Sequence, residues 1–223
     1  MKRDLSPAIG IGMTSSRTRG RMVERLRAKG IRDERVLAAL GSVPRHAFVE
    51  EALASRAYED TALPIGFSQT ISRPYVVARM IELLLEGRTP GRVLEIGTGC
   101  GYQAAVLAGI FPEVYSIERI KALHERARAN LRTLRLANLR LVHGDGYGGL
   151  EAAAPFDSII VAAAAPRLPE ALGRQLAPDG RMIFPLAQPA GGQRLVLLER
   201  RGRRYQETEL DPVHFVPMKA GKA

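Results

Sequence analysis

Apolar residues in the N-terminal third of the chain recur at helical spacing. From residue 21 to residue 54 they return every three or four positions, a pattern typical of helices with one buried face. Gly30 interrupts the pattern, and Asp33 is a suitable N-cap for a second helix. Pro44 ends that helix, because a proline disfavours helical backbone in the residue before it. A third short helix is predicted over residues 46–54.

Residues 58–72 depart from this helical pattern. They are rich in proline, glycine, serine and threonine, so we predict an ordered loop. Pro74 suits the first turn of a helix, and the apolar residues after it predict a helix over 75–85. Ser72 stands where an N-cap would be.

After Pro90 the pattern changes to short apolar runs separated by helical stretches. The runs predict strands at 93–96, 114–117, 139–142, 158–161 and 181–184. The stretches between them predict helices at 102–108, 121–134 and 169–176. Strands that alternate with helices form βαβ units around a parallel sheet. Two more strands, 195–199 and 213–216, are expected to pair through the basic turn between them.

Together these elements predict an α/β fold with a doubly wound, Rossmann-like and mostly parallel sheet. An N-terminal helical layer packs on the sheet, and an antiparallel hairpin completes it at the C-terminus. We divide the chain into a flexible extension (1–21), a helical layer with a ligand-contacting loop (22–89) and a ligand-binding core with the C-terminal strands (90–223). The extension is basic and polar and lacks an apolar run, so it does not resemble a secretory signal. Ligands of such sheets bind beyond the C-terminal ends of the strands.

Composition and charge narrow the possible functions only slightly. Hydrophobic residues make up 46% of the 223-residue chain, enough for a substantial core, and no apolar run approaches the roughly 20 residues that cross a bilayer. The net charge of +10 could attract an anionic partner. The cations are scattered, however, apart from residues 200–204, which are also typical of a hairpin turn. The single cysteine, Cys100, excludes an intrachain disulfide and fits a reducing cytoplasm.

A glycine-rich loop follows the first predicted strand and opens the next helix. It reads Glu95-Ile96-Gly97-Thr98-Gly99-Cys100-Gly101-Tyr102, and its glycines let the chain turn tightly and let a ligand reach the backbone. The dinucleotide fingerprint G-x-G-x-x-G would need glycine at position 102, so this loop weakens an NAD-binding interpretation without excluding it. A P-loop, with its lysine, is absent.

Acidic residues follow the next two strands. Glu118 lies 21 residues after Gly97, where a carboxylate can accept both hydroxyls of an adenosine ribose. Asp145 stands between Gly144 and Gly146 and could accept the amino group of an adenine, although an Asp-Gly pair is also a common turn. The order of these three features favours a cofactor that contains adenosine.

These elements resemble the fold of S-adenosyl-L-methionine-dependent methyltransferases, and one family within it more closely. Segment 62–75, with Gln69-Thr70-Ile71-Ser72 at its centre, is similar to the segment before the glycine loop in protein-L-isoaspartate O-methyltransferases. Other similar segments are Val43-Pro44-Arg45, Phe48-Val49, 93–102, 118–120, 143–146 and 215–217. The resemblance covers residues 22 to 218.

The resemblance implies which residues form the site. Ser72 is expected to be the catalytic residue. S-adenosylmethionine is expected to bind to Thr70, Ile71, Ser72, Glu95, Gly97, Thr98, Gly99, Gly101, Tyr102, Glu118, Arg119, Asp145 and Gly146. The substrate is expected to contact Ile65, Thr70, Ser72, Phe215 and Val216. The chain departs from the family at Cys100, where serine is usual, and at Ala162, where threonine is common; both residues are small, so cofactor binding should survive.

The resemblance also implies a reaction. Such enzymes transfer a methyl group to the free α-carboxylate of L-isoaspartyl residues in damaged proteins, and the ester closes to a succinimide, which begins repair. This carboxylate is ionised at neutral pH, so the transfer needs positioning more than a general base. The expected partners are isoaspartyl proteins and peptides. We expect a cytoplasmic monomer with no membrane association and no stable nucleic-acid partner. We also expect no metal, since the histidines lack a metal-like spacing.

Three other functions stay open. An NAD-dependent oxidoreductase would need an acid–base pair for hydride transfer, which is not evident, and Tyr102 argues against it. A nucleic-acid methyltransferase shares the fold, but residues 162–166 lack the Asn- or Asp-Pro-Pro-aromatic motif of many base-modifying enzymes. A non-catalytic RNA-binding protein would show RNA affinity that depends steeply on salt.

Overall fold

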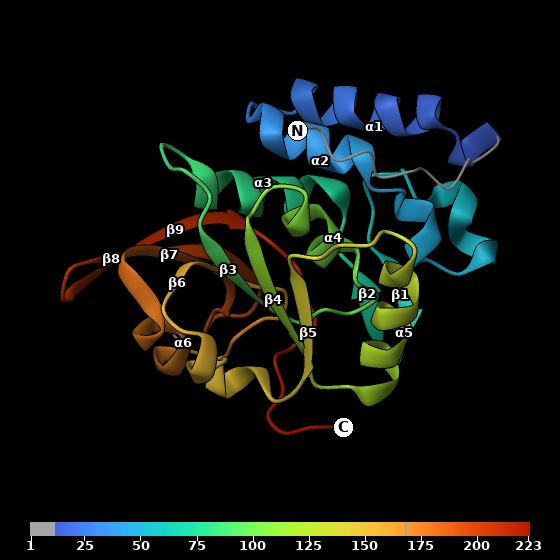
Figure 1. Ribbon diagram of the computed structural model, residues 1–223. Coiled ribbons are helices and arrows are strands. Elements are labelled where there is room, and N and C mark those ends of the chain that lie inside the picture. The colour runs from blue at the N-terminus through green and yellow to red at the C-terminus, as the bar shows by residue number, and fades with distance from the viewer. Residues whose placement is uncertain (1–11, 168) are drawn as a thin grey trace.

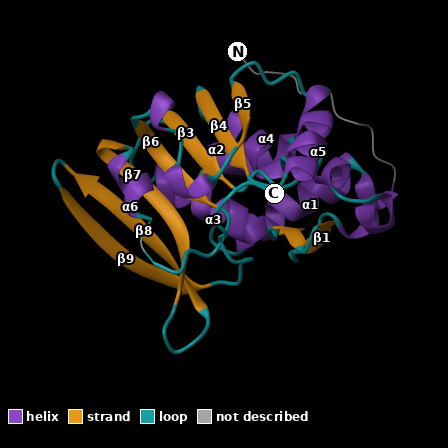
Figure 2. Cartoon of the chain, turned by 90° about the horizontal axis from the view of Figure 1, so that it is seen from below, coloured by secondary structure: helices purple, strands orange, loops and turns teal. Residues whose placement is uncertain are grey.

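A seven-stranded sheet forms the centre of the computed structural model, which describes residues 12–167 and 169–223 (Figure 1). The strands lie in the order β5-β4-β3-β6-β7-β8-β9, as Figure 2 shows from below. They are β3 (Arg92–Ile96), β4 (Glu113–Glu118), β5 (Leu139–His143), β6 (Phe156–Val161), β7 (Leu176–Ala187), β8 (Gln193–Arg201) and β9 (Arg204–Pro212). β3 to β7 are parallel, and β8 and β9 are antiparallel additions. The predicted doubly wound, mostly parallel fold is confirmed.

Helices cover both faces of this sheet. They are α1 (Ser16–Ala28), α2 (Glu34–Ser42), α3 (Pro74–Leu85), α4 (Tyr102–Ala108), α5 (Lys121–Arg132) and α6 (Glu170–Arg174). Side chains alternate across a strand, so Val93 of β3 packs into the cluster that contains residues of α1 to α5, while Leu94 packs into the cluster of Leu172 from α6. Two cores therefore sandwich the sheet.

The last strand differs from the prediction. β9 spans Arg204–Pro212, and the predicted strand at 213–216 is wrong. Apart from Leu210, the side chains of β9 are exposed. An edge strand pairs through its backbone, so it needs no apolar run that a search for strands would detect. The apolar run at 213–216 instead leads the chain back across the sheet, where Pro217 bridges to Ala164.

The N-terminal layer begins earlier than predicted. The first helix starts at Ser16, not residue 21, and the side chain of Ser15 caps it by accepting the Thr18 N–H at 3.3 Å. The predicted flexible extension therefore includes the first residues of α1, and its residues 1–11 lie outside the described part of the chain. Asp33 caps α2 as predicted, accepting the Arg35 N–H at 2.9 Å.

The helix predicted over 46–54 is wrong in type. Two short 3₁₀ turns, η2 (Arg45–Phe48) and η3 (Glu51–Arg56), occupy this segment. Neither has a side-chain N-cap, and a 3₁₀ turn shares its short apolar spacing with an α-helix. Three further 3₁₀ turns are η1 (Gly12–Thr14), η4 (Gly146–Gly148) and η5 (Glu151–Ala153).

The loop predicted over 58–72 contains a small antiparallel hairpin instead. Its strands are β1 (Leu63–Gly66) and β2 (Gln69–Ile71). The turn residues Phe67 and Ser68 both have positive φ, 54° and 56°, which suits the right-handed twist of a two-residue hairpin. The Asn-Gly pair that is usual in such hairpins is missing here, so the composition of the segment indicated a loop but not a hairpin.

Ser72 does not cap the helix that follows this hairpin. The N-cap of α3 is Arg73, with no side-chain capping bond, and Pro74 occupies the first turn as predicted. Because Pro74 sets where the helix begins, Ser72 lies outside it. Its hydroxyl is therefore not engaged in capping α3.

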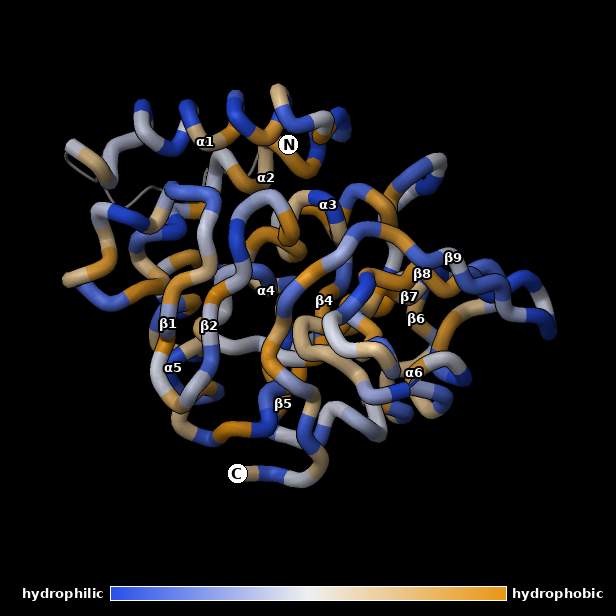
Figure 3. The backbone as a smooth tube through the Cα atoms, turned by 180° about the vertical axis from the view of Figure 1, so that it is seen from behind, coloured by the Kyte–Doolittle hydropathy of each residue, from blue (hydrophilic) through white to orange (hydrophobic). Residues whose placement is uncertain are grey.

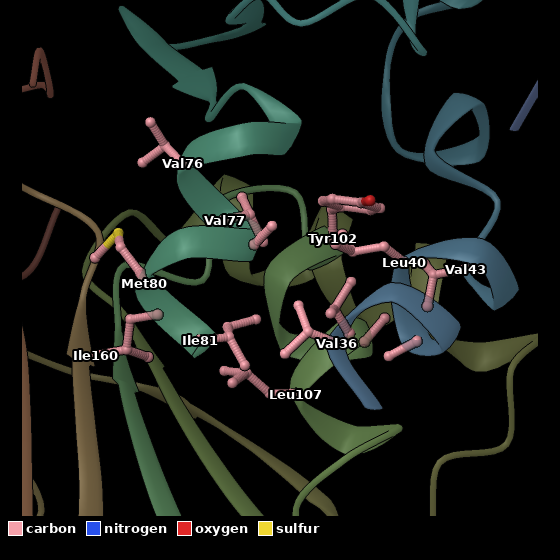
Figure 4. Packing of buried hydrophobic residues seen from close by; sticks show 14 of the residues in the cluster. Val36, Leu40, Val43, Val76, Val77, Met80, Ile81, Tyr102, Leu107 and Ile160 are labelled. Carbon is pink, nitrogen blue, oxygen red and sulfur yellow. The ribbon is translucent and has the colours of Figure 1, made fainter. Parts of the chain in front are cut away.

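Close packing fixes the helical layer onto the sheet. Val36, Leu40 and Val43 lie beside Tyr102 of α4, and Met80 of α3 lies next to Ile160 of β6 (Figure 4). Apolar positions concentrate in the central strands, while polar positions follow α1 and the β8–β9 hairpin (Figure 3). None of the helices described here is both long and apolar enough to cross a membrane.

Candidate active site

A cleft lies where the parallel strands end. It encloses about 910 Å³, part of it open to solvent. Its walls come from the β1–β2 hairpin, the glycine loop after β3, the ends of β4 and β6, and residues 216–219. The predicted site residues on these walls are Ile65, Thr70, Ile71, Ser72, Gly97, Thr98, Gly99, Tyr102, Glu118, Arg119, Gly146 and Val216. The walls do not include Glu95, Gly101, Asp145 and Phe215.

The glycine loop follows β3 in a conformation that side chains disfavour. Gly97, Gly99 and Gly101 have φ of 94°, 57° and 93°, the left-handed region that favours glycine. A Cβ on Gly101 would lie 2.9 Å from the Cδ1 atom of Leu131, so this glycine is required for packing behind the cleft. The Gly97 N–H donates to the carbonyl oxygen of Ile117 at 2.8 Å, which ties the loop to β4.

Glu118 presents a buried carboxylate to the cleft. Its side chain is only 5% exposed. One oxygen, Oε2, accepts the Gly99 N–H at 2.8 Å, and Oε1 accepts the Ile120 N–H at 2.9 Å. These bonds hold the carboxylate at the wall while leaving lone pairs on both oxygens for further donors. The position is suited to the two hydroxyls of a ribose.

The donor set fits S-adenosylmethionine. Glu118 offers an acceptor suited to its ribose, and the apolar residues beside it, Ile117, Ile120 and Leu123, line the same cleft and offer surface suited to an adenine ring. A Cβ on Gly97 would lie 3.5 Å from that of Ala162, so glycine keeps this side of the cleft open. A Cβ on Gly146 would lie 2.4 Å from the Cγ2 atom of Ile96, which explains why glycine is needed there.

Glu95 lies behind the glycine loop and not on the cleft wall. It is fully buried and accepts a hydrogen bond from the Ser116 hydroxyl, which lies 2.6 Å from the hydroxyl of Thr98. Burial raises the pKa of Glu95 to about 8, because desolvation disfavours the charged form. Glu95 is therefore connected to the cleft through neighbouring side chains, which include this pair of hydroxyls and the side chain of Gln103.

This raised pKa predicts a specific pH dependence of stability. A carboxyl group with a higher pKa in the folded state stabilises the fold below its unfolded pKa, and that contribution is lost as pH rises through the folded pKa. Between about pH 5 and 8, Glu95 should lower the free energy of unfolding by about 1.4 kcal/mol per pH unit. Glu95→Gln should remove this slope, measured by urea unfolding across the range. Parallel pH profiles for the two proteins would contradict the assignment.

Asp145 is turned away from the cleft toward the C-terminal segment. Its Oδ1 accepts the Tyr147 N–H at 2.9 Å, and its Oδ2 accepts the Gly221 N–H at 2.7 Å. Arg119 faces the same segment, donating from Nε to the Gly221 carbonyl at 2.9 Å. The predicted adenine contact of Asp145 therefore competes with a bond to the chain itself. Only Gly146, its neighbour, lies on the wall.

The C-terminal segment contributes wall residues, two of which the sequence did not indicate. Pro217, Met218 and Lys219 line the cleft beside Val216. The segment is held by backbone bonds, because the Met218 N–H donates to Ala164 at 2.8 Å. Pro217 belongs to the segment 215–217 that resembles the family, whereas no motif marks Met218 and Lys219, which only the fold brings to the cleft.

Ser72 is positioned by a buried arginine. Arg45 is fully buried, and its Nη2 donates to the carbonyl oxygen of Ser72 at 2.7 Å while its Nε donates to that of Ala57 at 2.8 Å. Its guanidinium lies 4.7 Å from the ring centre of Tyr102, within range of a cation–π interaction. Burial lowers the pKa of Arg45. One cation thus connects the helical layer, Ser72 and the glycine loop.

A second groove meets the cleft at the predicted catalytic residue. It encloses about 880 Å³ and shares Thr70, Ser72, Ala162 and Val216 with the cleft. Phe215 lines this groove and not the cleft, and Gln193 holds its backbone N–H and carbonyl at 2.7 and 2.9 Å. The predicted substrate residues therefore border two adjoining cavities, and Thr70 and Ser72 line both of them.

The remaining candidates are the thiol of Cys100 and a possible metal site. Cys100 is buried on the cleft wall, and burial raises the pKa of its thiol, which keeps it a neutral small side chain. Across residues 12–167 and 169–223, no three residues among histidine, cysteine, aspartate and glutamate lie in an arrangement that could hold a metal.

Comparison with known proteins connects this geometry to one family. The family model of protein-L-isoaspartate(D-aspartate) O-methyltransferases matches residues 17–223. The protein-L-isoaspartate O-methyltransferase of Dechloromonas aromatica is 62% identical over 213 residues, which are 95% of this chain and 98% of that protein. That of Azoarcus sp. strain BH72 is 64% identical, with 93% and 95% of the two chains covered.

Solved structures agree with the sequence relatives. A protein-L-isoaspartate O-methyltransferase is similar with a TM-score of 0.83 at 29% identity, covering 91% of this chain and 66% of that one. A PCMT protein from Plasmodium falciparum, in complex with S-adenosyl-L-homocysteine, has a TM-score of 0.80 at 26% identity, covering 90% and 98% of the two chains. The chain therefore belongs to the protein-L-isoaspartate(D-aspartate) O-methyltransferase family of S-adenosylmethionine-dependent enzymes.

Proposed function

We propose that this protein methylates the free α-carboxylate of L-isoaspartyl residues in damaged proteins and so begins their repair. The observation that carries the proposal is the junction of two cavities at Thr70 and Ser72. One cavity has the glycine loop and the carboxylate of Glu118, which suit an adenosine cofactor. The other is a groove of about 880 Å³ that is partly open to solvent. Relatives named for this activity cover nearly the whole chain.

The residues of the junction orient the acceptor and need not remove a proton from it. S-adenosylmethionine, when bound, supplies a methyl group activated by its sulfonium. A free α-carboxylate has a pKa near 3.5, so it is a nucleophile at neutral pH without a general base. The hydroxyls of Ser72 and Thr70 donate hydrogen bonds to one carboxylate oxygen and leave the other to attack. Arg45 holds the Ser72 backbone in place for this task.

Further predicted residues that line the two cavities keep their roles in the proposal. Glu118 binds the ribose, and the glycine loop and Gly146 let the cofactor approach the backbone. Ile65 and Val216 border the acceptor, and Phe215 borders the peptide. The backbone nitrogen of the following residue then attacks the carbonyl carbon of the ester, which closes a succinimide ring and releases the methoxy group, with the proton of that nitrogen, as methanol. Hydrolysis of the resulting succinimide returns part of the product to normal aspartate.

A labelling experiment tests this function directly. The protein is given methyl-labelled S-adenosylmethionine and two peptides that differ only in isoaspartate or normal aspartate at one site. Base-labile methyl ester on the isoaspartyl peptide alone would support the repair function. Labelling of neither peptide, with the cofactor still bound, would refute the acceptor, and RNA would then be the next acceptor to try.

We further propose that the enzyme acts as a cytoplasmic monomer without stable membrane or nucleic-acid partners. Both cavities are built within one chain, so the site needs no second copy. The basic run at the β8–β9 turn is partly engaged within the protein, since Arg200 donates to the carbonyl of Gly202 at 2.9 Å and Arg201 lies 3.6 Å from Glu199. Light scattering at catalytic concentration, with and without RNA, tests the monomeric state and the absence of a stable complex with RNA.

Ser72→Ala should lower kcat more than cofactor affinity. Ser72 lines both cavities and does not cap α3, so the removal of its hydroxyl should cost one hydrogen bond to the acceptor. That corresponds to a loss of about 1–3 kcal/mol, or roughly 5- to 150-fold in kcat/KM for the isoaspartyl peptide.

Two controls sharpen this prediction. Ser42→Ala removes an exposed hydroxyl that bonds only within α2 and should leave kinetics unchanged, while Ser72→Thr should restore much of the rate. If Ser72→Ala turned over like the parent enzyme, Ser72 would have no role in catalysis.

A further inference from the structure

The second groove carries positive charge and no negative charge on its walls. Its lining consists of apolar or hydroxyl residues together with two basic side chains, Arg73 and His214. Both basic side chains are exposed. Arg73 directly follows Ser72, so the cation lies next to the point where the acceptor carboxylate is expected.

Arg73 has a fixed backbone and an available guanidinium. It is the N-cap of α3, between Ser72 and the buried Pro74. Across the described residues, no carboxylate forms a salt bridge with it. Asp60, whose pKa the charge of Arg73 helps to lower, already pairs with Lys29 at 2.5 Å and accepts the Tyr75 N–H at 2.9 Å. The Arg73 guanidinium lies 5.9 Å from the Tyr75 ring centre, which leaves its N–H donors free for a ligand.

The helix beneath Arg73 adds to the same potential. The N-terminus of a helix is equivalent to a partial positive charge, and α3 is a 12-residue helix that begins at this position. A peptide that places its isoaspartyl carboxylate at Ser72 extends along the groove at about 3.3–3.6 Å per residue. A side chain within three residues of the isoaspartate can therefore reach Arg73.

We propose that Arg73 makes this enzyme select isoaspartyl segments that carry a second acidic residue near the damaged site. This inference rests on the proposed function and adds the class of substrate. An aspartate or glutamate in the groove meets a free guanidinium, whereas a lysine there meets a like charge in a groove without acids. Lone isoaspartates in basic surroundings are then the poorest substrates.

A peptide series tests this selection. Isoaspartyl peptides carry glutamate, alanine or lysine at each of the three positions on either side of the isoaspartate, and kcat/KM is measured at low and high salt. An exposed ion pair is worth up to about 1 kcal/mol, so glutamate at the best position should exceed alanine by about two- to fivefold. Salt screens exposed charges, so the advantage should shrink towards one at high salt.

Charge reversal assigns the preference to one residue. Arg73→Glu should invert the order, with lysine peptides methylated fastest, and Arg73→Gln should abolish the order. Arg203 is an exposed arginine in the β8–β9 turn. Arg203→Glu makes the same change in net charge and should keep the parental order of rates on the glutamate, alanine and lysine peptides. An exposed side chain can be changed in this way with little risk to folding.

Each outcome separates the two levels of the proposal. Equal rates on glutamate, alanine and lysine peptides would overturn the selection while leaving the methyltransferase intact. A glutamate preference that persists in Arg73→Glu would also overturn it, because another group would then be responsible. Methylation of none of the peptides by the parent enzyme would refute the proposed function, and the inference with it.

Discussion

Glu118→Ala should weaken S-adenosylmethionine binding by about 10- to 100-fold, or about 1.4–2.8 kcal/mol, measured by calorimetry. Two effects act in the same direction. The ribose loses a charged acceptor, and the N–H groups of Gly99 and Ile120 lose the carboxylate that they bind at 2.8 and 2.9 Å. The second effect makes the glycine loop less ordered, so part of the binding free energy of the cofactor must be spent on ordering this loop.

Matched variants isolate the role of the carboxylate. Glu118→Gln keeps an acceptor oxygen but no charge, and it should bind the cofactor with intermediate affinity. Glu113→Ala changes a glutamate at the opposite end of the same strand, where it pairs with Arg92 at 2.8 Å, and should leave the affinity unchanged. Parental affinity in Glu118→Ala would mean that the ribose is held by other groups.

Arg45→Ala should lower the free energy of unfolding by about 2–4 kcal/mol, measured by urea denaturation. The change leaves the carbonyl oxygens of Ala57 and Ser72 without their donors in a buried setting, and it empties the space beside the Tyr102 ring. The same variant should lose activity at temperatures where it is still folded, because the backbone of Ser72 is released.

Two substitutions separate hydrogen bonding from packing at this position. Arg45→Met refills the volume without donors and should recover only part of the lost stability. Arg45→Lys keeps the charge and can reach one carbonyl, so it should recover more. A loss below about 0.5 kcal/mol in Arg45→Ala, typical of a surface substitution, would show that water replaces the arginine without cost.

The connection between these two residues explains how the site stays assembled. Glu118 fixes the glycine loop from the side of β4, and Arg45 fixes Ser72 and the ring of Tyr102 from the side of the helical layer. The glycine loop, which is expected to hold the cofactor, and Ser72, which is expected to hold the acceptor, are therefore fixed from different layers of the fold. Their relative position depends on the packing of α2, α3 and α4 that Figure 4 shows.

Features encoded by local spacing could be predicted from the sequence alone. The alternation of apolar runs with helical stretches indicates the parallel sheet. The glycines of 97–101 indicate a tight loop, because glycine adopts the positive φ that these positions have in the structure. Glu118 follows from the same logic, because parallel strands end at one edge and place their last residues together. Asp33 and Pro74 are equally local, since capping and the first helical turn depend on neighbours in the chain.

Features made by pairing between distant segments could be decided only by the tertiary structure. The polar strand β9 is held by backbone bonds to β8 and shows no apolar pattern, and Asp145 is turned toward Gly221, which is distant in sequence. The burial of Arg45 depends on distant residues, because it donates to the carbonyl oxygens of Ala57 and Ser72 and lies against the ring of Tyr102. The sequence thus determined the fold class and the cofactor loop, because these depend on periodicity and on backbone conformations open to glycine. The tertiary structure decided the acceptor wall, because burial and hydrogen-bond partners exist only once distant segments meet.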